Sequence, residues 1–321
     1  MSQRRKWKFF IYRANYWRVK IFRKILKFLR FSNAPKEKTY AGRTVLTQDV
    51  FNKEVYDKIQ SGEPLMVSRF GSNEILNILE YLGVQYGFKK SMNARYVRQL
   101  SQNAGVFPCG EEIAARFAQY MLEVVPEIDY LGAWFRNMED YILKEYAIHA
   151  RPVRLKYLEP YMATNPWSKA LEGKKVLVIH PFDKTIQSQY KKRELLFENP
   201  DVLPEFELHT LKAVQSIGDN HNGFKDWFEA LDYMYEEAMK IDFDIAILGC
   251  GAYGLPLAAR LKRAGKQAIH LGGTVQLLFG IKGKRWDTDP LTYPLYNEHW
   301  VRPLPEETPA AAKSVESGCY W

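Results

Sequence analysis

Three glycines in the second half of the chain have the spacing of a phosphate-binding turn. Gly249, Gly251 and Gly254 follow a short apolar run and precede a helical pattern of leucines and alanines. We expect a strand over 245–248, a helix after the turn and a second strand over 267–271, which is the context this motif requires. Glycine allows close approach of the backbone, and a helix N-terminus favours an anion. A diphosphate is the leading ligand; the alternative is that the glycines only permit a sharp turn and close packing.

The end of the expected second strand disfavours a nicotinamide dinucleotide. Such a fold places an acidic residue there, about 20 residues after the turn, to hold the ribose. This chain has His270, Leu271 and Gly272 instead. An NAD-dependent, sugar-modifying enzyme is therefore kept only as an alternative.

A second polar group follows an expected strand over 65–68. Arg69 ends the strand, Gly71 lies in the turn and Glu74 falls in the first turn of a helix. Arg69 could bind a phosphate through two hydrogen bonds, and Glu74 could hold a metal or act as a base. The alternative is local, with Ser72 and Glu74 capping the helix and an Arg–Glu pair at the surface.

A third group follows an expected strand over 175–179. His180, Asp183, Gln187 and Lys191 could supply the hydrogen bonds and charge that a nucleotide sugar needs. Each has a simpler interpretation. His180 could be a histidine satisfied by the backbone, Asp183 a helix N-cap, and Lys191 part of a solvated basic run.

A basic loop over 280–287 comes after the glycine turn and its second strand. It contains Lys282, Lys284 and Arg285 together with glycines and a tryptophan. We expect it to contact the diphosphate and sugar of a donor, and an ordinary exposed basic loop is the alternative.

Residues 68–74, Ser-Arg-Phe-Gly-Ser-Asn-Glu, resemble the R-x-G-x-x-E signature of GT-D-fold glycosyltransferases, which are bacterial enzymes of glycan assembly. Residues 249–287 and 318–321 look like bacterial polysaccharide-biosynthesis proteins of the same clan. The resemblance implies sugar transfer from a nucleotide-sugar donor, usually with a divalent cation (Mn²⁺ or Mg²⁺) near an Asp-x-Glu motif. Here Ser72 replaces the aspartate of that motif, and only Glu74 matches it.

These observations give one set of expected site residues. Glu74 or Asp183 would deprotonate the acceptor hydroxyl or position a metal, and Glu74 is the one candidate metal ligand. The expected donor-binding residues are Arg69, Gly71, His180, Gln187, Lys191, Gly249, Gly251, Gly254, Lys282, Lys284 and Arg285.

The positive charge of the chain is concentrated at its beginning. The chain carries +9 over 321 residues, but residues 1–38 hold 13 Lys/Arg and one Glu, so the remainder carries −3. This disfavours a nucleic-acid-binding body. The three cysteines are far apart and suggest neither disulfides nor a metal site, which fits a reducing cytosol.

Residues 5–31 predict a basic amphipathic helix that lies on an anionic membrane surface. Packing of this helix on the protein's own body is the alternative, and a nucleic-acid arm is a third. Residues 32–38 read as a linker. The expected apolar face is formed by Trp7, Phe10, Ile11, Ala14, Trp17, Ile21, Ile25, Phe28 and Leu29.

The whole sequence predicts an α/β protein with a Rossmann-like, mostly parallel sheet flanked by helices. Further helices are expected over 48–60, 95–103, 111–124 and 224–240, and a strand over 206–211. The expected domains are a membrane-surface segment and linker (1–38), a catalytic body (39–303) and a tail (304–321).

The expected function is transfer of a sugar from a nucleotide sugar to a glycan or lipid-linked acceptor, in bacterial surface polysaccharide or glycoconjugate biosynthesis. The expected place is the cytoplasmic face of the cell membrane. An inactive nucleotide-binding scaffold at the membrane is the alternative from another class.

Overall fold

The computed structural model describes residues 3–28, 38–309 and 318–321, without the side chains of residues 17 and 19–28. Most of the predicted linker lies outside the described residues, as does Leu29. The side chains of Trp17, Ile21, Ile25 and Phe28 are also outside this description. The predicted domain boundaries at residues 38 and 303 stay predictions.

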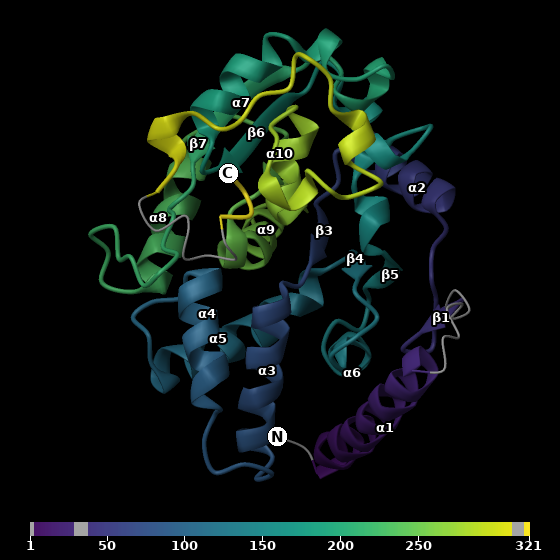
Figure 1. The fold of residues 1–321 in the computed structure, drawn as a ribbon, viewed down its shortest axis with the longest axis vertical. Coiled ribbons are helices and arrows are strands. Elements are labelled where there is room, and N and C mark those ends of the chain that lie inside the picture. Colours follow the sequence, from purple (N-terminus) through teal and green to yellow (C-terminus); the bar gives the residue numbers. More distant parts are fainter. Residues whose placement is uncertain (1–2, 29–37, 310–317) are drawn as a thin grey trace.

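A seven-stranded parallel sheet forms the centre of the protein, in the order β5-β4-β3-β9-β8-β6-β7 (Figure 1). A small antiparallel pair, β1 and β2, precedes it. The predicted α/β class with a Rossmann-like parallel sheet is confirmed. The strands are β1 (Thr39–Tyr40), β2 (Arg43–Thr44), β3 (Leu65–Arg69), β4 (Tyr130–Ala133), β5 (Arg151–Arg154), β6 (Lys175–His180), β7 (Glu207–Lys212), β8 (Ile245–Leu248) and β9 (Gln267–His270).

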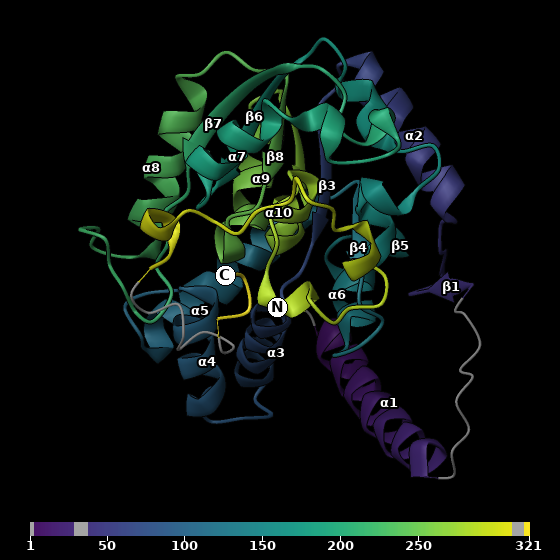
Figure 2. The ribbon, with the colours of Figure 1, turned by 45° about the horizontal axis from the view of Figure 1, so that its top comes forward.

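Helices cover both faces of the sheet, so its strands are buried on both sides (Figures 1 and 2). Alternate strand residues point to opposite faces: Val176 and Val178 join one apolar core, and Leu177 and Ile179 join the other. The core of Leu177 contains α3 (Ser72–Gln85), α4 (Ala94–Ala104), α5 (Glu111–Val124), α6 (Glu139–Glu145), α8 (Trp227–Met239) and α9 (Gly254–Arg263). The core of Val176 contains α2 (Gln48–Ser61), α7 (Asp183–Tyr190) and α10 (Val275–Leu278).

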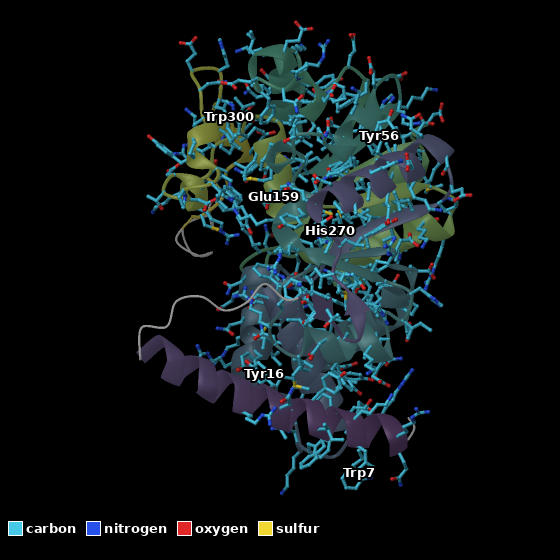
Figure 3. All side chains as sticks on the ribbon, turned by 90° about the vertical axis from the view of Figure 1, so that its right-hand side faces the viewer. Trp7, Tyr16, Tyr56, Glu159, His270 and Trp300 are labelled. Atoms are coloured by element: carbon cyan, nitrogen blue, oxygen red, sulfur yellow. The ribbon has the colours of Figure 1, made fainter. Side chains whose placement is uncertain are left out.

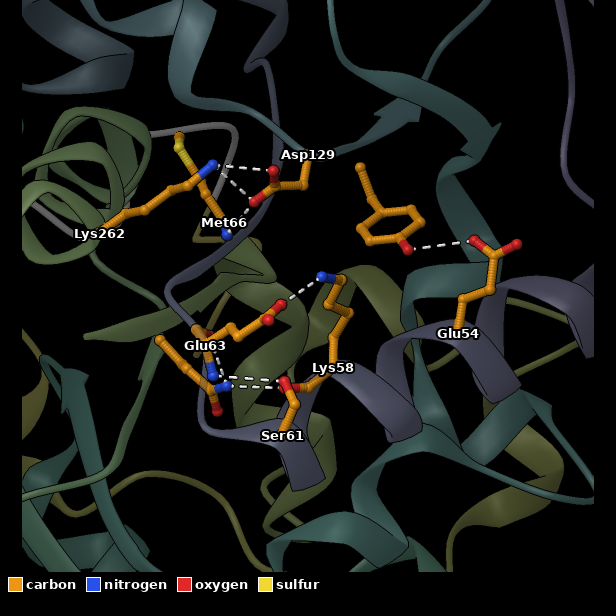
Figure 4. A network of polar contacts seen from close by, with 9 residues as sticks. Glu54, Lys58, Ser61, Glu63, Met66, Asp129 and Lys262 are labelled. Carbon is orange, nitrogen blue, oxygen red and sulfur yellow. Dashed lines mark hydrogen bonds and ion pairs between the residues drawn. The ribbon is translucent and has the colours of Figure 1, made fainter. Parts of the chain in front are cut away.

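A polar network fixes the amino ends of β3, β4 and β9 (Figure 4). Lys262 of α9 binds both carboxylate oxygens of Asp129, at 2.8 and 2.7 Å, and Asp129 also accepts the backbone N–H of Met66 at 2.8 Å. The side chain of Gln267 donates to the carbonyls of Lys58 and Glu63. The network therefore sets the register of the central strands at the end opposite the predicted site.

The N-terminal helix α1 (Gln3–Phe28) docks on the body through its first half. Phe9 is 2% exposed, and its ring lies 5.2 Å from the rings of both Tyr86 and Tyr141. Lys8 forms an ion pair with Glu145 of α6 at 2.6 Å. Packing on the protein's own body, the alternative left open by the sequence, is therefore observed for this part of the helix.

The predicted apolar face of α1 is a different face from the one that docks. Trp7, Phe10 and Ile11 are 65%, 49% and 59% exposed. Figure 3 shows Trp7 pointing away from the body and Tyr16 on the side that faces it. Among the described residues, no helix has both the length and the apolar character needed to cross a bilayer.

Replacing Phe9 with Ala should loosen α1, because a buried aromatic side chain in a close-packed site contributes about 3–5 kcal/mol. Hydrogen exchange of the amides in residues 3–16 should become faster, while exchange in the central strands stays unchanged. Trp7→Ala is the matched control, because Trp7 lies on the same helix, is 65% exposed and points away from the body, so its loss should change stability by about 0.5 kcal/mol or less. Equal exchange in the two variants would show that Phe9 does not hold the helix.

Candidate functional site

The carboxyl edge of the sheet brings the three predicted polar groups to one side of the molecule. Arg69 ends β3, His180 ends β6, and the glycine turn follows β8. The chain leaves β6 towards β7 and leaves β8 towards β9, which are opposite directions along the sheet. Open parallel sheets bind ligands beyond their carboxyl ends at such switch points.

A half-open pocket lies beyond the ends of β6 and β8 and encloses about 110 Å³. Three predicted residues, His180, Gly249 and Gly251, line it. A closed cavity that holds benzene measures about 150 Å³, so this smaller pocket accommodates a single ring because it is open on one side. The other lining residues are Asn103, Ala104, Pro181, Phe182, Val214, Gln215, Ser216, Ile217, Cys250, Tyr253, Gly273, Gln276, Tyr320 and Trp321.

His180 is a neutral residue whose position is fixed by the backbone. Its Nδ1 accepts the N–H of Phe182 at 3.0 Å, so the ring proton belongs on Nε2. Burial lowers the pKa of His180 to about 3. The alternative given by the sequence, a histidine satisfied by the backbone, is therefore observed, and the same side chain lines the pocket.

The glycines of the predicted turn have separable structural roles. Gly251 has a φ of +58°, which other residues rarely adopt. A Cβ on Gly249 would lie 2.4 Å from the ring of His180, and one on Gly254 would lie 2.3 Å from the ring of His270. Close packing, the alternative to ligand binding, thus explains Gly254. Gly249 and Gly251 also border the pocket, so their contact with a phosphate stays a prediction.

Arg69 is a partly buried cation without a carboxylate partner. Among the described residues no Asp or Glu oxygen lies within 4.0 Å of its guanidinium, and its one hydrogen bond runs from Nε to the carbonyl of Phe70. Burial lowers the pKa of Arg69. Gly272 has a φ of +68°, and a Cβ there would lie 3.2 Å from a terminal nitrogen of Arg69. The guanidinium therefore lies against an open backbone turn and has donors available for an anion.

Trp134 and Glu139 hold Arg69 from the side of β4. The Arg69 guanidinium lies 5.0 Å from the centre of the Trp134 ring, and the indole N–H donates to the carbonyl of Phe70 at 2.7 Å. Glu139 Oε2 accepts the backbone N–H groups of Trp134 and Phe135. Glu139 is fully buried, and burial raises its pKa to about 8.

Gly71 and Glu74 form the start of α3, but not as the local alternative describes it. Gly71 is the N-cap, no side chain caps the helix, and Ser72 is already helical. The Glu74 carboxylate folds back over Gly71, where a Cβ would lie 1.7 Å from Oε2. Burial raises the pKa of Glu74. Capping by Ser72 and an Arg69–Glu74 pair at the surface are therefore not observed, whereas Glu74 does lie in the first turn of α3, as that alternative described.

The described residues do not form a metal site made by the protein alone. They contain no group of three His, Cys, Asp or Glu side chains arranged to hold a cation. Glu74 is the single carboxylate of the motif, whereas hard cations take about six or more oxygen ligands. A cation here would depend on oxygens from the donor and from water, so the predicted Mn²⁺ or Mg²⁺ stays a prediction.

Asp183 is the first residue of α7 and not its N-cap, which is Phe182. Glu307 caps this helix instead: its carboxylate accepts the backbone N–H groups of Lys184 and Thr185. The N-cap alternative for Asp183 is therefore wrong, because a side chain from residues 304–321 takes that place. Asp183 does not line the pocket, and its Oδ1 is buried without a partner among the described residues.

Gln187 and Lys191 lie away from the pocket. Both are exposed, and Gln187 donates to the hydroxyl of Thr210 on β7. Neither side chain is among those that line the pocket. Their expected contact with the donor gains no support from this position.

The basic loop holds the segment 318–321 in place. The N–H groups of Lys284 and Arg285 donate to the carbonyls of Trp321 and Cys319. The Arg285 guanidinium lies 4.7 Å from the ring centre of Tyr320 and donates to its hydroxyl at 3.1 Å. Lys282 lies over the ring of Tyr296, at 5.5 Å. The expected role of this loop in donor binding stays a prediction.

The segment 318–321 joins the pocket to the surroundings of Arg69. Tyr320 and Trp321 line the pocket, and the Tyr320 hydroxyl lies near enough to Arg69 to affect its pKa. A Cβ on Gly273 would lie 2.3 Å from the Tyr320 ring.

Glu159 is a candidate that the sequence did not indicate. It follows β5 through the short helix Leu155–Leu158 and is 6% exposed. Its Oε2 has no hydrogen-bond partner among the described residues. Burial raises the pKa of Glu159 to about 7, while Lys156 and Arg69 act to lower it. The one available signal was a lone acid after a basic stretch, which does not reveal burial.

No protein-family model matches the chain. No curated protein matches it either. Two solved structures are similar to it, each at 15% identity, covering 83% of this chain and 93% of the other. One is a selenomethionine-substituted structure of domain of unknown function 1792, with a TM-score of 0.44. The other is of the same domain, described as having a distinct glycosyltransferase fold, with a TM-score of 0.43.

Glu139→Gln should change how stability depends on pH. The folded-state pKa of about 8 exceeds the ordinary value of 4.5 for a glutamate, so the folded protein holds the proton more tightly than the unfolded chain does. This group's contribution is complete below about pH 4.5 and is lost as the pH rises to about 8. Urea unfolding should show a decline on the order of 5 kcal/mol over that range in the wild type. The variant should lack this decline.

Glu172→Gln is the control for Glu139→Gln, because Glu172 is exposed and its replacement removes the same kind of charge at the surface. Its unfolding free energy should follow that of the wild type at every pH. If Glu139→Gln also followed the wild type, Glu139 would have to be ionised in the folded protein at neutral pH.

Proposed function

We propose that the protein is a glycosyltransferase that moves a sugar from a nucleotide-sugar donor to a glycan or lipid-linked acceptor. The observation that carries this proposal is Arg69, a partly buried guanidinium with no carboxylate partner among the described residues. It lies at the carboxyl edge of a parallel sheet, where a phosphate group would neutralise it. The resemblance of residues 68–74 to the GT-D signature supports the same function.

The two parts of the edge suit the two ends of a nucleoside diphosphate. The aromatic pocket beyond β6 and β8 has room for one ring, with Phe182, Tyr253 and Trp321 among its walls. The turn at Gly272 follows β9, one strand from β8, and Arg69 ends β3, one strand further along the sheet. A donor with its base in the pocket and its diphosphate at Arg69 would contact both of these parts of the sheet edge.

In this arrangement, the residues of the chain act mainly on the leaving group. Negative charge grows on the diphosphate as the bond to the sugar breaks, and a preorganised cation stabilises it most at that point. Trp134 on one side and the Gly272 turn on the other keep Arg69 in position before the donor binds. A divalent cation, if one takes part, would be held by Glu74 and would add further positive charge at the diphosphate.

We place this activity at an anionic membrane surface, on the cytoplasmic side, with bacterial surface polysaccharide or glycoconjugate biosynthesis as the setting. The exposed Trp7, Phe10 and Ile11 of α1 support this, together with the excess of Lys and Arg in residues 1–38. A lipid-linked acceptor would be concentrated at that surface.

Arg69→Lys should weaken donor binding, because an ammonium group cannot reproduce the planar pair of donors that a guanidinium presents to a phosphate. Isothermal calorimetry with UDP-, GDP-, CMP- and dTDP-sugars should show one preferred donor for the wild type. Its Kd should rise about tenfold or more in the variant, which corresponds to about 1.4 kcal/mol. Arg263→Lys is the control. Arg263 is exposed and is the last residue of α9, at the end of that helix away from the glycine turn, so the change should leave the Kd unchanged.

The same titrations separate the competing functions. Binding of a nucleotide sugar without transfer to any acceptor would favour the inactive scaffold, and tight binding of NAD would favour the NAD-dependent, sugar-modifying enzyme. Absence of binding to every nucleotide sugar would contradict the proposal. Parallel series with Mg²⁺, Mn²⁺ or EDTA, on wild type and Glu74→Ala, test whether Glu74 holds a cation.

The combined change of Trp7, Phe10 and Ile11 to Ser should reduce membrane binding, because it removes the exposed apolar face and leaves the basic residues in place. Co-sedimentation with vesicles containing phosphatidylglycerol should fall at least tenfold for the variant. Binding of the wild type should weaken as salt rises.

A matched control replaces three exposed apolar residues elsewhere, Leu195, Leu291 and Tyr293, with Ser. It should bind the vesicles as the wild type does. Equal losses in both variants, or no binding of the wild type, would contradict membrane docking through α1.

A further inference from the structure

We infer that Glu159 is the catalytic base that takes the proton from the acceptor hydroxyl, an inference that rests on the proposed glycosyltransferase function. Its position along the sheet edge, its burial and the groups that face it support this role.

The order of the strands places Glu159 on the acceptor side of Arg69. From the pocket, the edge runs from β6 through β8 and β9 to β3, which is three strand spacings or about 14 Å. A donor that extends from the pocket to Arg69 carries its sugar beyond Arg69, on the side of β4 and β5. Glu159 follows β5, and Figure 3 labels it together with His270, the residue that ends β9.

Glu159 is buried but incompletely satisfied. Its Oε2 and the hydroxyl of Tyr161 are both buried without a hydrogen bond of regular geometry among the described residues, and the two groups lie close enough to affect each other's pKa. A buried polar atom without a well-formed hydrogen bond costs about 1–3 kcal/mol, so such atoms are often explained by a ligand or by function. An acceptor hydroxyl that took the place of the Tyr161 hydroxyl beside this carboxylate would supply the missing hydrogen bond.

The groups facing Glu159 come from four parts of the chain. They are Lys156 and Tyr161 on either side in sequence, Arg69 from β3, and Asp289 from the loop before Thr292. Lys156 is shared, because it also pairs with Asp289 at 3.2 Å. Burial raises the pKa of the Glu159 carboxyl to about 7, against the opposing effect of Lys156, Tyr161 and Arg69. A base works best when its pKa lies near the working pH.

The reaction balances with these groups. The acceptor O–H bond breaks, and its proton passes to Oε2 of Glu159. The oxygen's electron pair forms the bond to the anomeric carbon of the sugar. The bond from that carbon to the phosphate oxygen breaks, and its electron pair leaves with the nucleoside diphosphate, beside Arg69.

The two carboxylates expected from the sequence are placed less well for this step. The Glu74 carboxylate lies folded over Gly71 at the start of α3. Asp183 begins α7 after β6, on the pocket's side of the sheet, and is not among the charges that act on Arg69. Glu159 and Glu74 both act on Arg69, but only Glu159 has an oxygen without a partner.

The test measures binding and turnover separately, in the full-length protein. Donor binding is followed by calorimetry, and turnover is followed with the preferred nucleotide sugar and two acceptor probes, water and octyl glucoside, across a range of pH. Glu159→Gln should keep the donor Kd within about twofold of the wild-type value. Its kcat should fall about 10²- to 10⁴-fold, the usual contribution of a general base.

The pH profile gives the readout that a structural role would not change. Wild-type kcat should rise with pH through about 7, because the ionised carboxylate is the active form. Glu159→Gln should lose this rise. Glu159→Asp, which keeps the carboxyl group, should retain a rise at lower kcat. The surface control Glu172→Gln should match the wild type throughout.

The possible outcomes are distinguishable. A wild type with no turnover of any donor overturns the proposed function, and the role of Glu159 with it. Turnover that Glu159→Gln leaves intact, with its pH rise, overturns the base alone. A parallel loss of donor binding and kcat shows that Glu159 positions Arg69 and is not the base. If Glu159→Gln does not fold, the inference is tested by how kcat depends on pH in the wild type and in Glu159→Asp. A wild-type kcat that does not rise with pH overturns the inference.

Discussion

The unneutralised charge of Arg69 is the constraint on which the arrangement of the carboxyl edge depends. A guanidinium removed from water loses hydration, and a close carboxylate usually replaces it. Here Glu74 and Glu159 act on Arg69 only from beyond 4.0 Å, and its close neighbours are the carbonyl of Phe70 and the face of Trp134. The structure therefore maintains an unmatched positive charge at the point where the strands end. An anionic ligand would complete it.

The two ends of the sheet are stabilised in different ways. At the amino ends, Lys262, Asp129 and Gln267 form direct hydrogen bonds that join β3, β4, β9 and α9. At the carboxyl ends, several buried polar atoms lack partners, among them Glu159 Oε2 and Gln276 Oε1. A fully hydrogen-bonded network makes the amino end of the sheet rigid. The carboxyl end can therefore keep buried polar atoms without partners, which would be unfavourable in an isolated loop.

The sequence predicted the elements whose patterns are local. The strand–turn–helix–strand from 245 to 271 and the helix capped by Thr47 were correct within a few residues, since apolar periodicity and turn residues define them. β4 and β5 were missed because each has four residues and no alternation. Glu159 was missed with them, because its burial depends on β5 lying at the sheet edge. The capping of α7 by Glu307 could not be predicted, because it joins residues 122 or more positions apart.

The docked helix connects the proposed membrane surface to the proposed donor site through a short series of contacts. Phe9 of α1 packs on Tyr141 of α6, and α6 begins with Glu139. Glu139 in turn holds the backbone of Trp134, whose ring lies against Arg69. Since each contact is buried or partly buried, the exposed face of α1 and the guanidinium have a fixed relative position. A membrane bound by that face would therefore present its lipid-linked sugars to one defined side of the sheet edge, and not to a freely rotating body.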